Sequence, residues 1–502
     1  MLWRSTDGGS NWSDITSDGT NELHVDMHAI AFAADSSKMY VGNDGGVWST
    51  ANLTGTVTWT NLNASATDAT KSLAILQFYP GMAITSPTYI FGGTQDNGSQ
   101  LFTGNVVWNE IACGDGGWSA IDPGNNNIVY TACNDLDVEK STNNPPNWNS
   151  FSQVMNGLPT DPNAERVAFI PPMVMDPINS AILYFGTYRL YRTANGAGSW
   201  TLVGNGNDLT GGIGFCGGAS APVISTIAVS PVAHTTVWVG TCDGKVQVTA
   251  NADQGASATF SDRTSTLPTR TVTQIAVDPT DNTGNTVYAT FSGFTVGSDT
   301  KGHVFKTTNG GTSWNDVSGN LPNTPVNDIV VDPVLPNTVY IGTDVGVFYT
   351  TNANAGPPTW NTLVVGLPKV AVLSLKLHAA SRTLVAGTHG RSAWSVLLGS
   401  PISLQPSPVS FGNRLIYAYA TIPVTLANDK LRLPGPEIPH DRHNIAGLKG
   451  SRERLPKSGG FHRRIRMEPF HPFGSSFTTG RIISSMETPP CWKLSRYWFK
   501  YL

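Results

Sequence analysis

The chain has 502 residues, of which only 13% are charged, and it contains 52 Gly and 14 Trp. This length exceeds one ordinary core, and many turn residues with few charges are typical of short strands rather than helices. Residues 1–400 hold 16 Lys and Arg against 29 Asp and Glu (net −13), and residues 401–502 hold 15 against 6 (net +9), which agrees with the overall −4. The acidic body excludes nucleic acid as a partner, which needs a basic surface. No apolar run reaches the roughly 20 residues of a membrane helix.

The first segment, residues 1–12, reads "MLWRSTDGGSNW" and lacks the basic and apolar regions of a signal peptide. It opens inside a motif that recurs further along the chain, so we expect a truncated N-terminus. The next segment, "HVDMHAIAF", places His24, Asp26 and His28 at alternate positions, which share one face of an extended strand. Imidazole and carboxylate groups could hold a divalent metal, but three alternate strand residues rarely converge on one ion. The prediction is a polar strand entry that helps to bind a ligand, with no metal and no cofactor.

One phrase then recurs along the chain. A short apolar strand ends at an Asp-Pro or Ser-Pro turn, and a second strand follows that usually ends in Gly. The residue before the Pro stands at five regularly spaced positions, Asp122, Asp176, Ser230, Asp278 and Asp332. Their spacings are 54, 54, 48 and 54 residues, and three weaker copies bring the number of repeats to eight. Each unit continues with a Gly/Asp/Asn turn, a third strand, and a fourth strand that holds Trp. Four strands per repeat of this length predict an all-β fold, a β-propeller in which eight blades are favoured within a range of seven to ten.

A second motif lies between the third and fourth strands. It is nearly complete at Ser5–Trp12 ("STDGGSNW") and Thr307–Trp314 ("TTNGGTSW"), and looser at Thr193–Trp200 ("TANGAGSW"). In such a turn a hydroxyl and a short polar side chain bond backbone amides, Gly takes a positive φ, and Trp packs between blades. These residues resemble the Asp-box, or BNR repeat, of sialidases, sortilin-type receptors and xyloglucanase-type glycoside hydrolases. The resemblance covers residues 1–398 and implies a structural role for the polar residue of each box, Asp7, Asn195 and Asn309.

The end of the chain predicts three segments. Residues 1–398 form the propeller, whose last unit supplies three strands, and "NWSDI" (residues 11–15) is expected to add the fourth strand and close the ring. Residues 399–426 are a linker and the start of an Ig-like module. Residues 427–502 lose the alternating pattern and gain Pro, Arg and His, which is typical of a basic disordered tail or of an out-of-frame read. Five cysteines allow one or two disulfides that spacing alone does not assign.

The turns can be sorted by face, because antiparallel strands run back and forth. The entries to the first strands share one face with the turns between second and third strands, and polar side chains there predict a ligand site near the propeller axis. We expect Asp96 and Asp115 to be catalytic, since two carboxyl groups beside a sugar can act as general acid and as base or nucleophile. The alternative for each Asp is ordinary turn chemistry. The predicted substrate-binding residues are His24, Asp26, His28, Asp44, Asn97, Trp118, Tyr188, Asp243, Asp344, His389 and Arg391.

The resemblance also bears on function. Sialidases use an arginine triad with a Tyr/Glu pair, and the scarcity of Arg in the body disfavours that activity. Xyloglucanase-type enzymes take one Asp from each of two propellers, whereas one propeller is expected here. The prediction is a secreted or extracellular, bacterial-type, monomeric propeller that engages a polysaccharide or glycan, with hydrolysis as the reaction that Asp96 and Asp115 would perform and with exposed Trp118 and Tyr188 stacking on sugar. The alternative is a non-catalytic, sortilin-like propeller that binds a protein or peptide.

Overall fold

The structure, a computed structural model, describes residues 1–63, 73–105, 107–212, 221–363 and 366–399. Three later strands are described by their backbone alone: Ile402–Gln405 (β34), Thr425–Asn428 (β35) and Phe499–Tyr501 (β36). The chain divides into two units, Met1–Leu398 with Tyr497–Leu502, and Gly399–Arg496. In the second unit β34 pairs antiparallel with β35. The expected Ig-like start and basic tail otherwise lie outside the described residues.

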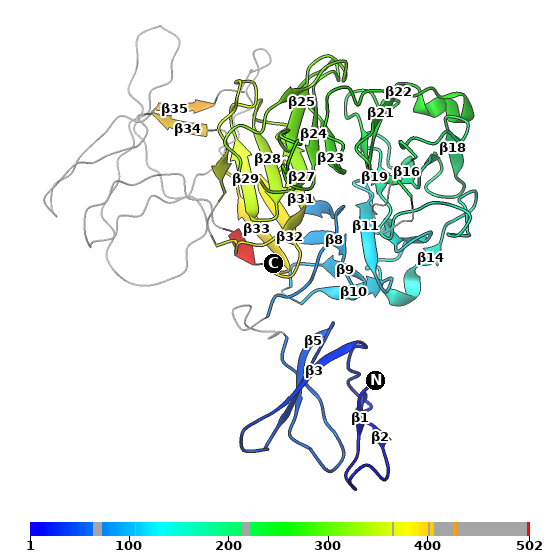
Figure 1. Ribbon diagram of the computed structural model, residues 1–502, viewed down its shortest axis with the longest axis vertical. Helices are drawn as coiled ribbons and strands as arrows, with labels where there is room; N and C mark the ends of the chain where they lie inside the picture. Colours follow the sequence, from blue (N-terminus) through cyan, green and yellow to red (C-terminus); the bar gives the residue numbers. More distant parts are fainter. Residues whose placement is uncertain are drawn as a thin grey trace, which may run out of the picture. The chain divides into compact units, whose positions relative to one another are not determined.

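The first unit is built from eight four-stranded antiparallel sheets among its described residues, each following chain order from one edge to the other (Figure 1). Three of them are β3–β6 (Met27–Phe32, Met39–Asn43, Gly46–Thr50, Thr60–Asn61), β7–β10 (Ala83–Ser86, Tyr89–Gly93, Ser99–Phe102, Asn109–Ala112) and β11–β14 (Gly116–Ile121, Val129–Cys133, Val138–Ser141, Ser152–Gln153). The next three are β15–β18 (Met173–Met175, Leu183–Gly186, Leu190–Thr193, Thr201–Val203), β19–β22 (Ile224–Val229, Val237–Thr241, Val246–Thr249, Ser261–Asp262) and β23–β26 (Val272–Val277, Val287–Phe291, Val304–Thr307, Asn315–Asp316). The last two are β27–β30 (Val326–Val331, Val339–Thr343, Gly346–Thr350, Asn361–Thr362) and β31–β33 (Val372–His378, Thr383–Thr388, Ala393–Leu397) with β36.

Other elements are short. Trp3–Arg4 (β1) pairs with Ser13–Asp14 (β2), and two 3-10 helices cover Trp148–Ser150 (η2) and Ala252–Ser257 (η3). Within the described residues there is no helix of the length and apolar character that crossing a membrane requires.

Seven of the sheets form a closed ring. The first strands β7, β11, β15, β19, β23, β27 and β31 contact one another in this order, and β31 contacts β7. At the closure, the backbone N–H of Phe78 donates to the carbonyl of Thr388 (2.9 Å), and that of Met82 donates to Ser374 Oγ (3.2 Å). This arrangement confirms the β-propeller of four-stranded blades, with a ring of seven rather than the favoured eight.

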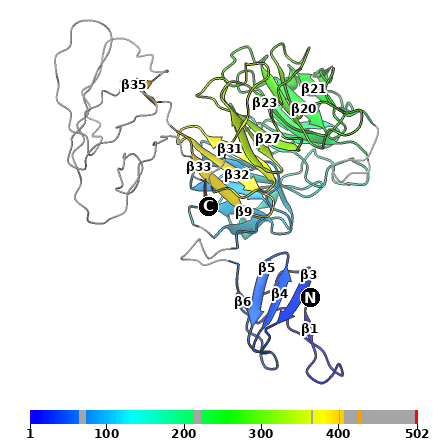
Figure 2. The ribbon, with the colours of Figure 1, turned by 60° about the vertical axis from the view of Figure 1, so that its left-hand side comes forward.

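The eighth sheet, β3–β6, is complete but is not part of the ring; Figure 2 shows it as one sheet with β1 beside it. The predicted ring closure by residues 11–15 is therefore wrong. Strand β2 pairs with β1, and β36 pairs with β33 of the last blade instead. The physical reason is local: the turn that joins β1 to β2 brings them together at small cost in loop entropy, so β2 has its partner before any distant blade can supply one.

The turns between third and fourth strands hold neighbouring blades together. In two of the boxes, the side-chain oxygen of Asn195 or Asn309 accepts the N–H four residues later, at 2.9 and 3.0 Å. The Trp that ends each of these boxes donates its indole N–H to a backbone carbonyl of the preceding blade, from Trp200 to Val154 and from Trp314 to Arg263, both at 2.8 Å. This geometry is that of a structural turn.

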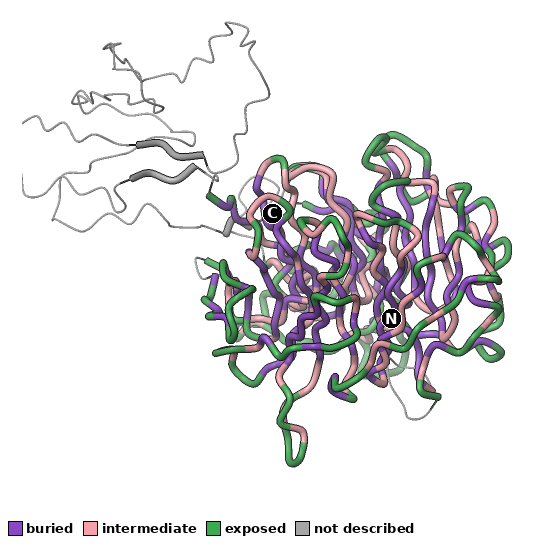
Figure 3. Tube along the Cα trace, turned by 90° about the horizontal axis from the view of Figure 1, so that it is seen from above, coloured by how far each residue is buried: buried purple, intermediate pink, exposed green. Residues whose placement is uncertain are grey.

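The core lies between blades rather than at one centre. In one of these clusters Tyr288 of β24 packs with Ile329 and Val331 of the next blade's first strand. Figure 3 shows the same division along the trace, with strand segments mostly buried and turns mostly exposed. Because the apolar residues on both faces of the ring blades are mostly covered, the turns at the ends of the strands carry the polar side chains that remain available for chemistry.

Candidate functional site

The predicted catalytic residues are brought together by two adjacent blades. Asp96 lies in the turn between β8 and β9 with φ of 57°, a left-handed conformation that Asp and Asn tolerate better than most residues. Its backbone N–H donates to Asp115 Oδ1 at 2.9 Å, and Asp115 stands directly before β11 of the next blade. The entry to one blade and the second turn of the blade before it therefore meet on one face.

The charge around Asp96 favours its protonated form. Burial raises the pKa of the Asp96 carboxyl above its usual value, and the negative charges of Asp115 and Asp44 raise it further. Smaller effects come from His24, which lowers this pKa, and from Asp26, which raises it. A half-buried carboxyl group crowded by other carboxylates is the type of group that can deliver a proton.

The sheet β3–β6 reaches this site through its own turns. His24 Nε2 lies 2.5 Å from the carbonyl oxygen of Asp96, and Asn97 Nδ2 donates to the carbonyl of Asp44 at 3.1 Å. His28 Nε2 is 2.5 Å from Asp44 Oδ1, so this pair forms within the sheet itself. The three polar residues of "HVDMH" thus differ in environment: His24 contacts the ring, His28 contacts Asp44, and Asp26 is exposed with φ of 61°.

The sequence did not single out Tyr79, which lies beside the two catalytic candidates. Burial, followed by the charges of Asp115 and Asp96, raises the pKa of Tyr79 to about 12. Its ring centroid is 6.1 Å from that of His389, whose backbone pairs with Gln77. The sequence did hold a signal for Tyr79, namely its position: "LQFYPGM" (residues 76–82) leads into the first strand β7 just as "HVDMH" leads into the first strand β3.

His389 and Arg391 come from the turn between β32 and β33. The Nδ1 atom of His389 is buried and has no hydrogen-bond partner among the described residues. Arg391 is exposed and its guanidinium donates to the carbonyl of Gly390 at 2.8 Å. His389 therefore lies beside Tyr79, whereas the Arg391 head group is directed to its own turn.

The expectation of an exposed Trp118 is wrong. Its side chain is only 4% exposed and belongs to the core cluster between two blades. It lies so close to Gly81 that a Cβ on that glycine would come within 2.4 Å of the indole ring. The reason is that every residue of β11 is buried between its neighbours, so the polar-entry pattern of "GDGGW" ends at Asp115.

The other predicted binding residues lie in three different blades and have local partners. Tyr188, which was also expected to be exposed, is partly buried, because guanidinium groups flank it, with Arg166 at 4.1 Å and Arg189 at 4.8 Å from its ring centroid. Asp243 Oδ2 accepts the N–H of Gly211 at 2.7 Å, and Asp344 Oδ1 accepts from Asn327 Nδ2 at 2.9 Å. These contacts engage the three side chains within the protein, and none of them links the three residues to Asp96.

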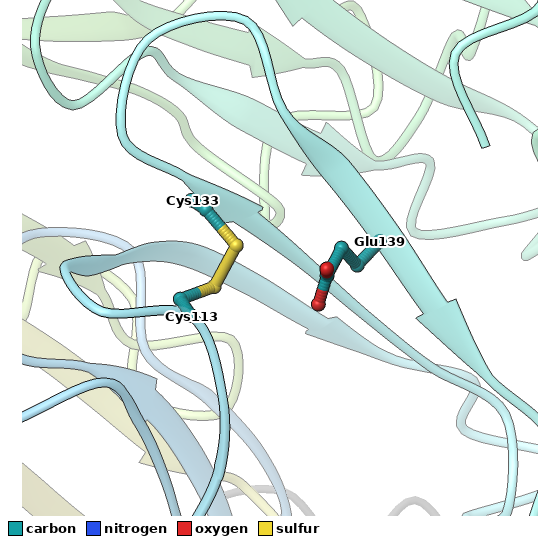
Figure 4. Close-up of side chains that lie close together, drawn as sticks. All are labelled: Cys113, Cys133 and Glu139. Atoms are coloured by element: carbon teal, nitrogen blue, oxygen red, sulfur yellow. A yellow bond between two sulfur atoms is a disulfide. The ribbon is translucent and has the colours of Figure 1, made fainter. Parts of the chain in front are cut away.

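A disulfide anchors the loop that carries Asp115. Cys113 is bonded to Cys133 at the end of β12, with the Cα atoms 5.5 Å apart, and Glu139 lies beside the bridge (Figure 4). Metal ligation by cysteine requires a thiolate. Because the two sulfur atoms are bonded to each other, this group of three side chains is not a metal site in the structure.

We expect the Cys113→Ser, Cys133→Ser double variant to lose about 3 kcal/mol of unfolding free energy, as the removal of a cross-link closing a loop of this size predicts. The measurement is chemical denaturation of the variant and the unaltered chain under non-reducing conditions. The single Cys113→Ser variant is the control, since it breaks the same bond and should lose a similar amount. Unchanged stability of the double variant would contradict a stabilising bridge.

No protein-family model matches the chain, and no curated protein matches it. Among solved structures, a GH74 xyloglucanase from Xanthomonas campestris matches with a TM-score of 0.49 and 15% sequence identity. The match covers 65% of this chain and 53% of the xyloglucanase chain. An ancestral GH74 enzyme has a TM-score of 0.42 and 21% identity over 57% of this chain and 36% of its own. A WD40 β-propeller domain has a TM-score of 0.42 and 12% identity over 63% of this chain and 93% of its own. The chain thus spans about half the length of the xyloglucanase, and at these identities the likeness concerns only the fold.

Proposed function

We propose that the protein hydrolyses a polysaccharide or other glycan at the turns around Asp96. The observation that carries this proposal is the placement of Asp96, half-buried, with its N–H on Asp115 and its carboxyl within the field of Asp115 and Asp44. Such crowding raises the pKa of the Asp96 carboxyl, and a carboxyl that holds its proton to higher pH is suited to the role of general acid in glycoside hydrolysis.

In this proposal Asp96 is the general acid. It gives its proton to the glycosidic oxygen as the bond from that oxygen to the sugar's anomeric carbon breaks. Asp115 is the second carboxylate, acting as base toward water or as nucleophile. Its Oδ1 already accepts the Asp96 N–H, which fixes its orientation relative to the acid.

Substrate contacts would come from the polar residues around the pair. Asn97, His24 and Asp44 line the contact between the ring and the sheet β3–β6. Tyr79 lies beside His389, which belongs to the turn between β32 and β33 of the last blade. The Tyr79 hydroxyl, like that of any Tyr, keeps its proton at neutral pH and can donate to a sugar oxygen.

The disulfide supports export from the cytoplasm. Bridges such as Cys113–Cys133 form and persist in oxidising compartments. A secreted or extracellular location is therefore part of the proposal, in keeping with a polymeric glycan as substrate.

A non-catalytic binding propeller is the second candidate. The observation in its favour is that several turn carboxylates, among them Asp243 and Asp344, are occupied by hydrogen bonds within the protein. Such groups shape a surface without taking part in chemistry.

The test is release of reducing ends by the purified full chain from a panel of plant and microbial polysaccharides. We expect release from at least one polymer. Binding of a polymer without release would support the second candidate and overturn hydrolysis. If the chain neither cleaves nor binds any polymer of the panel, a glycan is excluded as its partner.

A further inference from the structure

The turn between β24 and β25 is the longest of the turns that join second to third strands in the ring. It spans residues 292–303, whereas the corresponding turns of the other ring blades have two to five residues. Its tip is in solvent, with Phe294 and Val296 both exposed. Ordering a loop of this length costs conformational entropy, so interactions at its base have to hold it in place. Like the turn of Asp96, it lies on the face of the ring to which second strands lead.

Arg270, which precedes β23, binds both ends of this loop. Its guanidinium donates to the carbonyl of Ser292 at 3.0 Å and to those of Lys301 and Gly302 at 2.7 and 2.6 Å. Its Nε atom lies 2.9 Å from Asp299 Oδ2. One cation thereby holds the first residue of the loop and its last residues together.

His303 completes the base of the loop, and its side chain is buried. Its Nδ1 atom lies 2.9 Å from Arg270 Nη1, and its Nε2 atom lies 3.0 Å from Asn323 Oδ1. A guanidinium group can only donate, so Nδ1 accepts and carries no hydrogen. The ring is therefore neutral, with its hydrogen on Nε2, from which it donates to Asn323.

Asn323 carries this connection to the tip of the loop. Its Oδ1 atom also accepts the backbone N–H of Thr295 at 2.8 Å, and its Nδ2 atom donates to the Thr295 carbonyl at 3.3 Å. A single neutral imidazole thus links the cation at the base of the loop to the amide that holds its tip.

The elements that pack against His303 hold few charged groups among the described residues. These groups are Arg270 before β23, Asp299 and Lys301 in the loop, and Asp316 in β26. Lys301 directs its Nζ atom away, to the carbonyl of Leu267 at 2.9 Å, and Asp316 accepts the N–H of Gly302 at 2.8 Å. Residues 317–325, which include Asn323, contain no charged residue.

This environment favours the neutral ring. Burial lowers the pKa of His303 below its usual value, and the charge of Arg270 lowers it as well. The bond to Asn323 and the charge of Asp316 act in the opposite direction without cancelling the effect of burial. A second proton would have to bind at Nδ1, the atom that accepts from Arg270.

We propose that His303 is a pH-sensitive latch that holds the β24–β25 loop closed while its ring is neutral. Protonation at Nδ1 replaces the hydrogen bond to Arg270 by two donors and two positive charges that face each other. The protonated ring is more stable in water, so it leaves its place and releases the loop from Arg270 and Asn323. The shape of this part of the face then depends on pH, whether or not the protein hydrolyses a glycan.

The direction of the pH effect follows from the two states of the loop. With the loop open, the His303 ring is in water and has the ordinary pKa of about 6.5. With the loop closed, the pKa is lower. The open state therefore binds more protons between these two values, and opening becomes more favourable as pH falls, by up to about tenfold per pH unit for one proton.

The test is hydrogen exchange of the full chain over a series of pH values from about 7.5 to about 4.5, a range that includes the ordinary pKa of His. Protection factors, which remove the intrinsic pH dependence of amide exchange, are measured for residues 293–302. The loop amides of Thr295 and Gly302 are hydrogen-bonded in the closed state. The box Thr307–Trp314, at the other end of the same blade, is the internal reference.

Two variants accompany the unaltered chain. In His303→Asn the amide oxygen can accept from the guanidinium as Nδ1 does, but the side chain does not titrate. His378→Asn is the matched control, because it removes a partly buried histidine of the last blade whose Nδ1 atom has a hydroxyl partner of its own. If His303→Asn does not fold, His303→Gln replaces it with the same outcomes.

We expect the protection of residues 293–302 to be constant above about pH 6.5 and to fall below it by up to about tenfold per pH unit, with the box unchanged. His303→Asn should remove this dependence, and His378→Asn should retain it. Constant protection of the loop over the whole series would overturn the proposal, as would the same fall in His303→Asn. A parallel fall in the box would also overturn it, because the whole blade rather than the loop would then be opening.

Discussion

Asp96→Asn is expected to lower glycan hydrolysis by about 10² to 10⁴-fold, the loss typical of removing a general acid. The amide has nearly the shape of the carboxyl but carries no proton to give to the leaving oxygen. Asn also tolerates the left-handed backbone that this turn requires, so the fold should persist. The measurement is the initial rate of reducing-end release from the polymer that the unaltered chain cleaves.

A control for this variant exists in the next blade. Asp135 stands in the corresponding turn between β12 and β13 with φ of 58°, and Asp135→Asn should leave the rate unchanged. Equal rates for Asp96→Asn and the unaltered chain would exclude Asp96 as the acid.

The pH dependence of the rate gives an independent check. A general acid works while protonated, so activity falls as pH rises through its pKa. Because the pKa of Asp96 is raised, first by burial and then by Asp115, this decline should lie at higher pH than for an ordinary Asp.

Asp115 is itself proposed to be catalytic, so Asp115→Asn should lower the rate. In the activity that remains, the decline should move to lower pH, because one of the charges that raise the pKa is gone. An unshifted decline in that variant would contradict the coupling of the two groups.

Arg382→Ala is expected to reduce the unfolding free energy by about 3 to 5 kcal/mol, the loss typical of breaking a buried ion pair by removing one partner. The Arg382 guanidinium donates to both carboxylate oxygens of Asp332, at 2.8 and 2.7 Å, and joins the last blade to the blade before it. Asp332 is fully buried, so its charge would be left without its partner. Chemical denaturation at neutral pH measures the loss.

The matched control is an exposed ion pair. Lys245 Nζ lies 3.4 Å from Asp262 Oδ2 with both side chains partly in solvent, so Lys245→Ala should cost about 0 to 1 kcal/mol. A loss for Arg382→Ala no larger than for Lys245→Ala would show that the buried pair does not stabilise the ring.

The sequence by itself determined the repeating unit. Alternating apolar residues, Asp-Pro turns such as that at Asp332, and boxes such as Thr307–Trp314 all act within a few tens of residues of one another. Strand period and turn chemistry are local, so four strands per blade and the meeting of Asp96 with Asp115 could be predicted from spacing alone.

Only the tertiary structure decided how the units combine. The ring closes between Met82 and Ser374, which are 292 positions apart, and no local pattern specifies which repeats will meet at that distance. The same packing buries Trp118, brings Tyr79 beside the carboxyl groups and pairs Cys113 with Cys133. Burial and contact between blades depend on which surface faces which, and this is a property of the assembled ring rather than of any one repeat.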